Sequence, residues 1–88
     1  SMKIRVKLFA NLGVYIPKGT ADGPTRNEAD FDADDDATVS GVLGQLGVPN
    51  EFCHLVLVNG FFIPPSERDG RTLVEGDDLA VWPPVAGG

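Results

Sequence analysis

The sequence has few of the residues from which disulfides and metal sites are built. Among 88 residues there is one cysteine, Cys53, and one histidine, His54. One cysteine excludes an internal disulfide, and a single neighbouring histidine is too little for a zinc site unless distant carboxylates join it. Adjacent residues of an extended segment point to opposite faces, so His54 is poorly placed to activate Cys53. We expect a buried structural cysteine and no bound metal or cofactor.

Basic residues are also scarce. Seven Lys and Arg stand against 13 Asp and Glu, which gives a formal net charge of −6. Nucleic-acid binding needs clustered positive charge to neutralise phosphates, so this composition argues against that class of function. We expect the natural partners to be proteins with basic surfaces.

Long apolar runs are missing as well. No stretch approaches the ~18 apolar residues of a membrane span, and no signal peptide is evident. We therefore expect a cytoplasmic protein that makes no membrane contact. The 88 residues are enough for one domain with a single core. We expect this domain to be a monomer when free.

Two segments in the first half alternate between apolar and polar residues. Ile4, Val6 and Leu8 alternate with basic residues, and Phe9 then falls on the opposite face. In residues 29–34, alanine and phenylalanine alternate with three aspartates. A period of two predicts strands with one buried face, and the row of aspartates predicts a solvated sheet edge. These aspartates lack the glycine and glutamate that a calcium loop needs.

Between these segments, residues 12–27 are rich in glycine, proline and polar residues. This composition predicts a loop. We expect the short apolar run Val14-Tyr15-Ile16 to anchor it to the domain.

One helix is predicted after the second strand. Apolar residues recur at i, i+3, i+4 and i+7 from Val39 to Leu46, which is the pattern of one apolar helix face. Thr38 is a suitable N-cap, and Gly47 and Pro49 end the helix. Two internal glycines weaken it, so packing onto a sheet must hold it together.

Apolar runs in the second half of the sequence predict three further strands, at residues 55–58, 61–63 and 79–82. Asn59-Gly60 between the first two is a strong signal for a tight hairpin. The complete order is strand, strand, helix, strand, strand and a final strand. This order predicts an α+β fold in which a mixed sheet of four to five strands packs on one main helix.

The last six residues are unusual for a chain end. They are Pro83, Pro84, Val85, Ala86, Gly87 and Gly88, directly after an apolar strand. Proline stiffens the backbone in extended geometry, and glycine removes the side chain at the tip. Such an arm can carry a terminal carboxylate into a channel too narrow for side chains. We expect a domain at residues 2–82 and a functional tail at residues 83–88.

Four segments carry a family resemblance. They are Lys7-Leu8-Phe9-Ala10, Thr38-Val39, Leu57-Val58-Asn59-Gly60 and the whole block from Leu73 to Gly88. Together they resemble the ubiquitin-like sulfur carriers of the MoaD/ThiS family, in particular the small subunit of molybdopterin synthase. The resemblance covers nearly the whole chain and implies a β-grasp fold, in which the first and last strands lie side by side at the sheet centre.

The resemblance also implies a sulfur carrier that is not itself an enzyme. In this family an E1-like adenylating enzyme of the MoeB/ThiF type uses ATP to activate the terminal carboxylate, here that of Gly88. A sulfur donor then forms a thiocarboxylate, which is ionised at neutral pH and nucleophilic. The implied acceptor is an enzyme such as the large subunit of molybdopterin synthase, which makes molybdenum or tungsten cofactor.

Partner docking needs a surface as well as the tail. In the last strand Leu79 and Val81 should point into the core, which leaves Trp82 outward, and Phe9 is out of phase with the buried residues before it. We predict that Phe9 and Trp82 form an aromatic anchor near the tail, and the resemblance implies an interface role for both positions. Leu57 is expected to extend this patch.

Other functions fit the same residues. The sulfur can instead go to thiamine thiazole, cysteine or another thio-metabolite. The activated Gly88 can also be joined to lysines of other proteins, as in a ubiquitin-like modifier, because an amine can attack the same acyl adenylate. A purely structural interaction domain is a third alternative.

Overall fold

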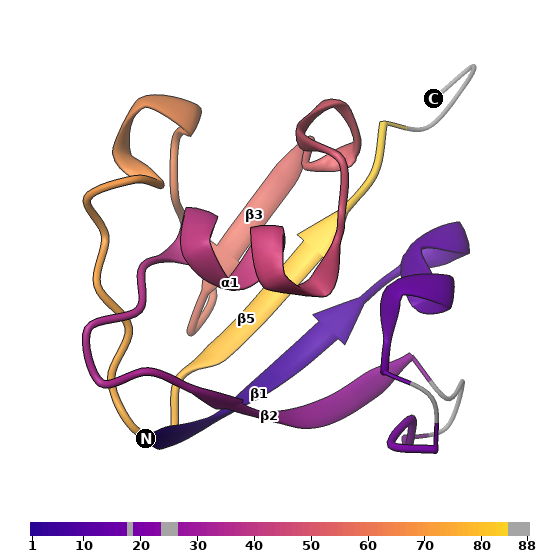
Figure 1. Cartoon of the computed structure of the whole chain (residues 1–88). Helices are drawn as coiled ribbons and strands as arrows, with labels where there is room; N and C mark the ends of the chain where they lie inside the picture. Colours follow the sequence, from indigo (N-terminus) through magenta and orange to yellow (C-terminus); the bar gives the residue numbers. More distant parts are fainter. Residues whose placement is uncertain (18, 24–26, 85–88) are drawn as a thin grey trace.

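The computed structural model describes residues 1–17, 19–23 and 27–84, which form a five-stranded mixed sheet with one α-helix across one face (Figure 1). The strands are β1 (Met2–Leu8), β2 (Glu28–Ala33), β3 (Leu55–Val58), β4 (Phe61–Phe62) and β5 (Asp78–Trp82), and the helix is α1 (Val39–Leu46). Three short 3-10 helices connect them, η1 (Ala10–Tyr15), η2 (Asn50–Phe52) and η3 (Pro65–Glu67). The predicted α+β class is confirmed, and no helix of the described ranges is long and apolar enough to cross a membrane.

The first and last strands pair at the centre of the sheet. The strand order is β2-β1-β5-β3-β4, in which β1 and β5 are parallel and the other neighbours are antiparallel. Backbone bonds extend this pairing at both ends, from Arg5 N to Asp77 O at 2.8 Å and from Phe9 N to Val81 O at 3.0 Å. This is the β-grasp arrangement, as expected. The C-terminal strand is therefore held on both sides.

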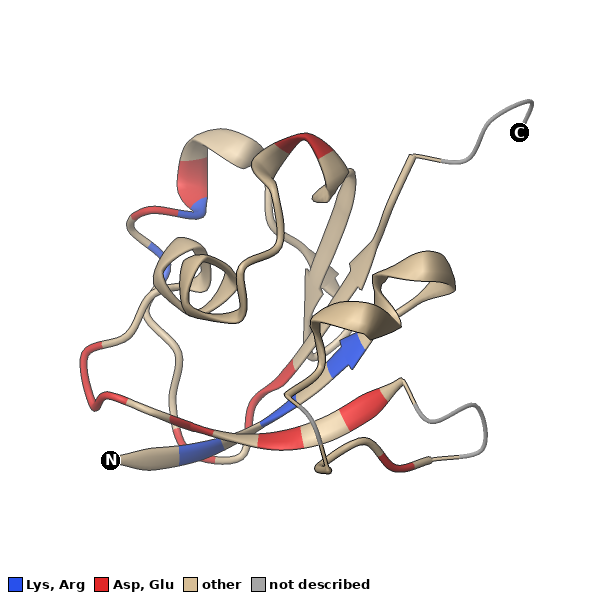
Figure 2. Cartoon of the chain, turned by 45° about the vertical axis from the view of Figure 1, so that its right-hand side comes forward, with Lys and Arg blue, Asp and Glu red and all other residues tan. Residues whose placement is uncertain are grey.

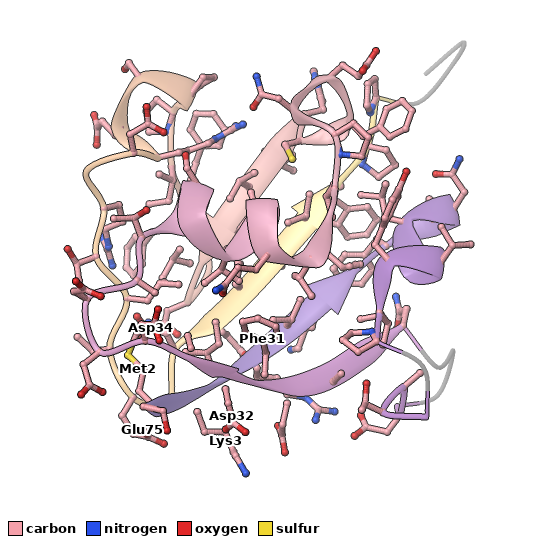
Figure 3. All side chains as sticks on the ribbon, viewed as in Figure 1. Met2, Lys3, Phe31, Asp32, Asp34 and Glu75 are labelled. Atoms are coloured by element: carbon pink, nitrogen blue, oxygen red, sulfur yellow. The ribbon has the colours of Figure 1, made fainter. Side chains whose placement is uncertain are left out.

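One face of the sheet is buried against α1. Alternate residues of the three central strands are almost fully inaccessible, namely Ile4, Val6, Leu8, Val56, Val58, Leu79 and Val81. The helix adds Val39, Val42 and Leu43 to the same core. Burying each such side chain contributes roughly 1.5 to 3 kcal/mol. The alternation is visible on β2, where Phe31 points to the helix side while Asp32 lies on the opposite side with Lys3 of β1 (Figure 3).

The ends of α1 form as its sequence predicts. The Thr38 Oγ1 accepts a hydrogen bond from Gly41 N at 3.1 Å, which satisfies one free N–H of the first turn. Gly47 closes the helix with φ 84°, a left-handed conformation that glycine adopts without strain. The two caps limit the helix to eight residues, and its apolar face packs on the sheet.

The predicted Asn59-Gly60 hairpin joins β3 to β4 and is tied to the start of β5. Asn59 and Gly60 have φ values of 53° and 86°, the positive values that a tight hairpin turn requires. The buried Asp77 carboxylate accepts hydrogen bonds from Asn59 Nδ2 and from Val74 N, both at 2.9 Å. Asn59 Oδ1 in turn accepts a bond from Asp78 N at 2.9 Å. One carboxylate thus fixes the hairpin to the turn that begins β5.

The prediction that Val14-Tyr15-Ile16 anchors the loop after β1 is partly wrong. Residues 10–15 form the 3-10 helix η1 instead of an irregular loop, and Leu12 and Ile16 are the buried residues while Val14 is 81% exposed. Leu12 lies within η1 and Ile16 follows it in an extended conformation, and these two side chains reach the core while Val14 stays outward. The apolar run in the sequence gave no sign of this turn, because its residues are adjacent and carry no period.

The Asp77 network makes a testable prediction for stability. Replacing Asp77 with alanine leaves the Asn59 amide and the Val74 N–H without their acceptor, so we expect a loss of about 3 kcal/mol of unfolding free energy. Urea unfolding followed by Trp82 fluorescence measures the change. The exposed Asp36→Ala is the control and should shift the midpoint little. An unchanged midpoint in Asp77→Ala would contradict the role of this network.

Candidate functional site

The chain stays packed against the domain for one residue after β5 ends at Trp82. Trp82 O accepts a hydrogen bond from His54 N at 3.2 Å, and Pro83 is buried while Pro84 is exposed. We call Trp82 and Pro83 the tail base. Pro83, the first residue of the predicted tail, is therefore packed against the domain. Four predicted tail residues lie outside the described residues, namely Val85, Ala86, Gly87 and Gly88.

Phe9 and Trp82 are in contact beside the tail base. Their ring centroids are 3.9 Å apart and their planes differ by 7°, which is a stacked pair. Phe9 follows β1 and Trp82 ends β5, so the parallel pairing of these strands brings the rings together. Such a pair contributes roughly 0.5 to 1.5 kcal/mol beyond its buried area. Trp82 keeps 38% of its surface exposed, so the stack still offers an aromatic face to a partner.

The stack continues into an apolar surface on the sheet face opposite α1. Leu55 pairs with Trp82, while Leu57 pairs with Ala80 on one side and with Phe62 on the other. Leu55 and Leu57 are half-buried, and Phe62 is 50% exposed. We call this surface the outer apolar patch; its members are Phe9, Leu55, Leu57, Phe62, Ala80 and Trp82.

Sequence reasoning found three members of the outer apolar patch and missed others. Phe9, Trp82 and Leu57 were predicted, whereas Leu55 and Phe62 were not. The sequence contained evidence for both residues. Leu55 is two positions from Leu57 and so points to the same face of β3, and the two-residue turn places Phe62 opposite Leu57. What the sequence does not give is the pairing of β3 with β5, which places Leu55 beside Trp82.

The rest of this sheet face is a strip of paired charges. Arg5 of β1 binds Asp22, and it also binds Glu28 and Asp30 at 3.1 Å each. Hydrogen bonds to Asp22, then to Asp30 and Glu28, raise the pKa of Arg5, so its charge is permanent. Lys7 lies 3.4 Å from Asp78. The aspartate row of β2 does form a sheet edge, as predicted, but Asp30 faces a basic partner.

Charged and uncharged surfaces are therefore separated on the domain. Figure 2 shows basic residues on β1 beside acidic residues on β2, whereas η1 and the C-terminal half of β5 carry no charge. Within the strip Arg5 and Lys7 are paired with four carboxylates, so these paired residues keep a net negative charge. The uncharged half of β5 leads to the tail base, whereas neighbouring segments carry Lys7, which pairs with Ala80, and the exposed Glu51 of η2.

Cys53 is buried, which confirms the structural role expected for it. Its Sγ lies 3.5 Å from Pro49 O, which accepts the weak hydrogen bond of the thiol. Burial raises the pKa of the Cys53 thiol, and the positive charge of Arg68 opposes part of this rise. A buried thiol with a raised pKa is a poor nucleophile.

Residues 19–88 match the ThiS family, and this matched range includes Gly87 and Gly88. The chain belongs to the ThiS family. No curated protein sequence matches it.

Solved structures place this ThiS-family chain among ubiquitin-like β-grasp proteins. SAMP1 of Haloferax volcanii is 27% identical with a TM-score of 0.62, and the match covers 98% of this chain and 99% of that one. The thiamine biosynthesis protein ThiS of Geobacter metallireducens is 17% identical with a TM-score of 0.59, covering 96% and 99%. In a complex of subunits 1 and 2 of the molybdopterin-converting factor of Helicobacter pylori, the matching chain is 18% identical with a TM-score of 0.56, covering 99% and 100%.

These relationships identify the ThiS-family chain as a small sulfur carrier or a ubiquitin-like modifier. Small carrier proteins of the ThiS and MoaD type are not catalysts themselves.

The buried thiol makes a prediction for the ThiS-family chain. Cys53 should react with a thiol reagent such as iodoacetamide at pH 8 at least tenfold more slowly in the folded protein than in urea, because both burial and its raised pKa suppress the thiolate. Mass spectrometry of timed samples measures the rate. Equal rates in the two states would contradict the structural assignment of this cysteine.

Proposed function

We propose that this chain is a sulfur carrier whose Gly88 carboxylate is activated by an adenylating enzyme and converted to a thiocarboxylate. The observation that carries the proposal is the tail base, where a buried Pro83 follows the central strand β5 and lies beside the exposed Phe9–Trp82 stack. A rigid base gives the following residues a defined direction, and prolines keep the start of the arm extended. Membership of the ThiS family supports the chemistry.

The proposed chemistry needs a partner because a carboxylate is a poor electrophile. An oxygen of the Gly88 carboxylate attacks the α-phosphorus of ATP and pyrophosphate leaves, which forms an acyl adenylate. Hydrosulfide from a sulfur donor then attacks the carbonyl carbon and displaces AMP, which leaves the thiocarboxylate. ATP and the catalytic groups belong to an E1-like enzyme of the MoeB/ThiF type. The role of this chain is to present Gly87-Gly88, where two glycines allow entry into a narrow active site.

Docking to the activating enzyme and to the sulfur acceptor is proposed to use the outer apolar patch. Aromatic residues that keep one face exposed are frequent energetic centres of protein interfaces, and Trp82 is such a residue. The patch adjoins the tail base, so one binding event can orient both. The acceptor is an enzyme such as the large subunit of molybdopterin synthase. The Helicobacter pylori relative supports this arrangement, since it is seen in a complex of subunits 1 and 2.

The proposed destination of the sulfur is molybdopterin, with thiamine thiazole, cysteine or another thio-metabolite as alternatives. The block from Leu73 to Gly88, with its Trp82-Pro83-Pro84 sequence, resembles the small subunit of molybdopterin synthase. The ThiS match favours thiazole as the first alternative.

A second candidate function is conjugation to proteins. The specific observation in its favour is the 27% identity to SAMP1, a small archaeal modifier protein, over nearly the full length of both chains. In this function a lysine amine displaces AMP and forms an isopeptide bond with Gly88. Both functions use the same activated intermediate, so their products distinguish them.

The intact mass of the protein from its native host tests the proposal. Replacing one carboxylate oxygen by sulfur adds about 16 mass units, and we expect this species in the wild-type chain. A chain lacking Gly88 is the control and should show no such species, while its thermal unfolding should stay unchanged. Conjugates to lysines without any sulfur-bearing species would instead establish the modifier function.

Docking is tested by the substitution Trp82→Ala. We expect at least a 30-fold weaker Kd for the adenylating enzyme, about 2 kcal/mol, because an exposed aromatic at the tail base is lost. Isothermal titration calorimetry measures the affinity. The matched control is Val74→Ala, since Val74 is also apolar and exposed but lies before β5, at the opposite end of that strand. Equal affinities for the two variants would exclude the patch as the docking surface.

A further inference from the structure

Arg68 is a buried arginine whose side chain binds backbone carbonyls. It follows η3 and is only 4% exposed. Its Nε donates to Ile63 O at 3.1 Å, and its Nη1 donates to Cys53 O at 2.7 Å. Within the described part of the chain, Nη2 has no hydrogen-bond partner and no carboxylate forms an ion pair with the guanidinium. The side chain therefore acts on the backbone just after β4 and just before β3.

The backbone around Arg68 is itself fixed to the start of α1. Arg68 O accepts a hydrogen bond from Ser40 N at 3.1 Å, and Arg71 O accepts one from Val39 N at 3.0 Å. The planar guanidinium also presents its donors in a fixed geometry, so little freedom is lost for each bond that it makes. Arg68 thus has a firm origin from which to hold the carbonyl of Cys53.

The Cys53 carbonyl belongs to the same peptide group as the His54 N–H. This peptide is trans, so its oxygen and its hydrogen point to opposite sides. The oxygen accepts the bond from Arg68 Nη1 at 2.7 Å, and the N–H donates to Trp82 O at 3.2 Å. One peptide group therefore lies between the buried cation and the tail base. A charged donor on the carbonyl polarises the peptide and strengthens its N–H as a donor.

The bond from His54 to Trp82 lies where the strand can no longer donate. Pro83 and Pro84 have no N–H, so the backbone at these two positions can be hydrogen-bonded only through carbonyls. His54 N holds the carbonyl directly before Pro83. Its length of 3.2 Å is at the upper end of the usual range, so a small rotation of the peptide plane is enough to break the bond.

From these observations we propose that Arg68 is a positioning residue for the tail. It fixes the plane of the peptide between Cys53 and His54, and this peptide in turn holds Trp82 O at the tail base. The purpose of this relay rests on the proposed function, in which an adenylating enzyme takes up the tail. If the tail base is loosened, the enzyme has to order it on binding, and this lowers affinity for the chain.

Amide hydrogen exchange, followed by nuclear magnetic resonance on the free chain, tests the relay in Arg68→Lys. Lysine keeps the charge but has no planar fork, so it cannot keep both carbonyl bonds in the same geometry. The internal control is Asn59 N, which donates to Asp78 O at 2.9 Å at the other end of the β3–β5 pairing. We expect the ratio of the His54 exchange rate to the Asn59 rate to rise about tenfold.

The ratio separates positioning from stability alone. A general loss of stability accelerates exchange at Asn59 at least as much as at His54, so it leaves the ratio unchanged or lowers it. The scalar coupling through the hydrogen bond between His54 N and Trp82 O should also weaken in Arg68→Lys. An unchanged or lower ratio overturns the proposal.

The second measurement is the rate of pyrophosphate release from ATP by the adenylating enzyme of the same host. We expect Arg68→Lys to raise the KM for the chain about fivefold with kcat unchanged, because only the ordering of the tail base on binding is affected. Asp77→Ala is the matched control, since it also removes buried hydrogen bonds but acts at the start of β5. Its KM should equal that of the wild type.

The two measurements distinguish this proposal from the proposed function. If the wild-type chain is not activated, the proposed function fails and the exchange ratio still decides whether Arg68 holds the tail base. If Arg68→Lys is activated with the KM of the wild type, or if Asp77→Ala raises KM equally, the positioning role of Arg68 is overturned.

Discussion

The parallel pairing of β1 with β5 is the constraint on which the rest of the structure depends. Two strands from opposite ends of the chain lie side by side at the sheet centre, and their buried side chains form the middle of the core. This pairing also brings Phe9 onto Trp82 and fixes the point where the tail leaves the domain. Since β5 is hydrogen-bonded on both sides, its end has little freedom to move. In the proposed function, this gives the tail that carries Gly88 a rigid origin.

The two faces of the sheet differ in what they contact. The inner face packs on α1 and supplies most of the buried apolar area. The outer face is divided between paired charges around Arg5 and an apolar region around Trp82 (Figure 2). Arg5 and Lys7 of β1 are paired with four carboxylates, so this strip itself carries part of the acidic excess of the chain. This division leaves Trp82 and Pro83 of the tail base outside the charged strip around Arg5.

Strands, helix and hairpin could be predicted because each has a local signal. Ile4, Val6 and Leu8 alternate at the period of a strand, Thr38 and Gly47 mark the ends of α1, and Asn59-Gly60 marks the hairpin. The 3-10 helix η1 was missed, because its residues have no period and Val14 resembles a core residue without being one. The Asp77 network was missed too, since nothing adjacent in sequence shows that Asn59 lies beside it.

The sequence by itself determined the fold class, the single buried cysteine and the family, because local periodicity and a terminal motif are properties of neighbouring residues. Only the tertiary structure decided which residues surround the tail base and that the side chain of Arg68 is buried. Leu55 meets Trp82 through the pairing of β3 with β5, and Arg68 meets Cys53 O across 15 positions of sequence. Such contacts follow from the burial of one common core, which brings distant segments together and has no local signature in the chain.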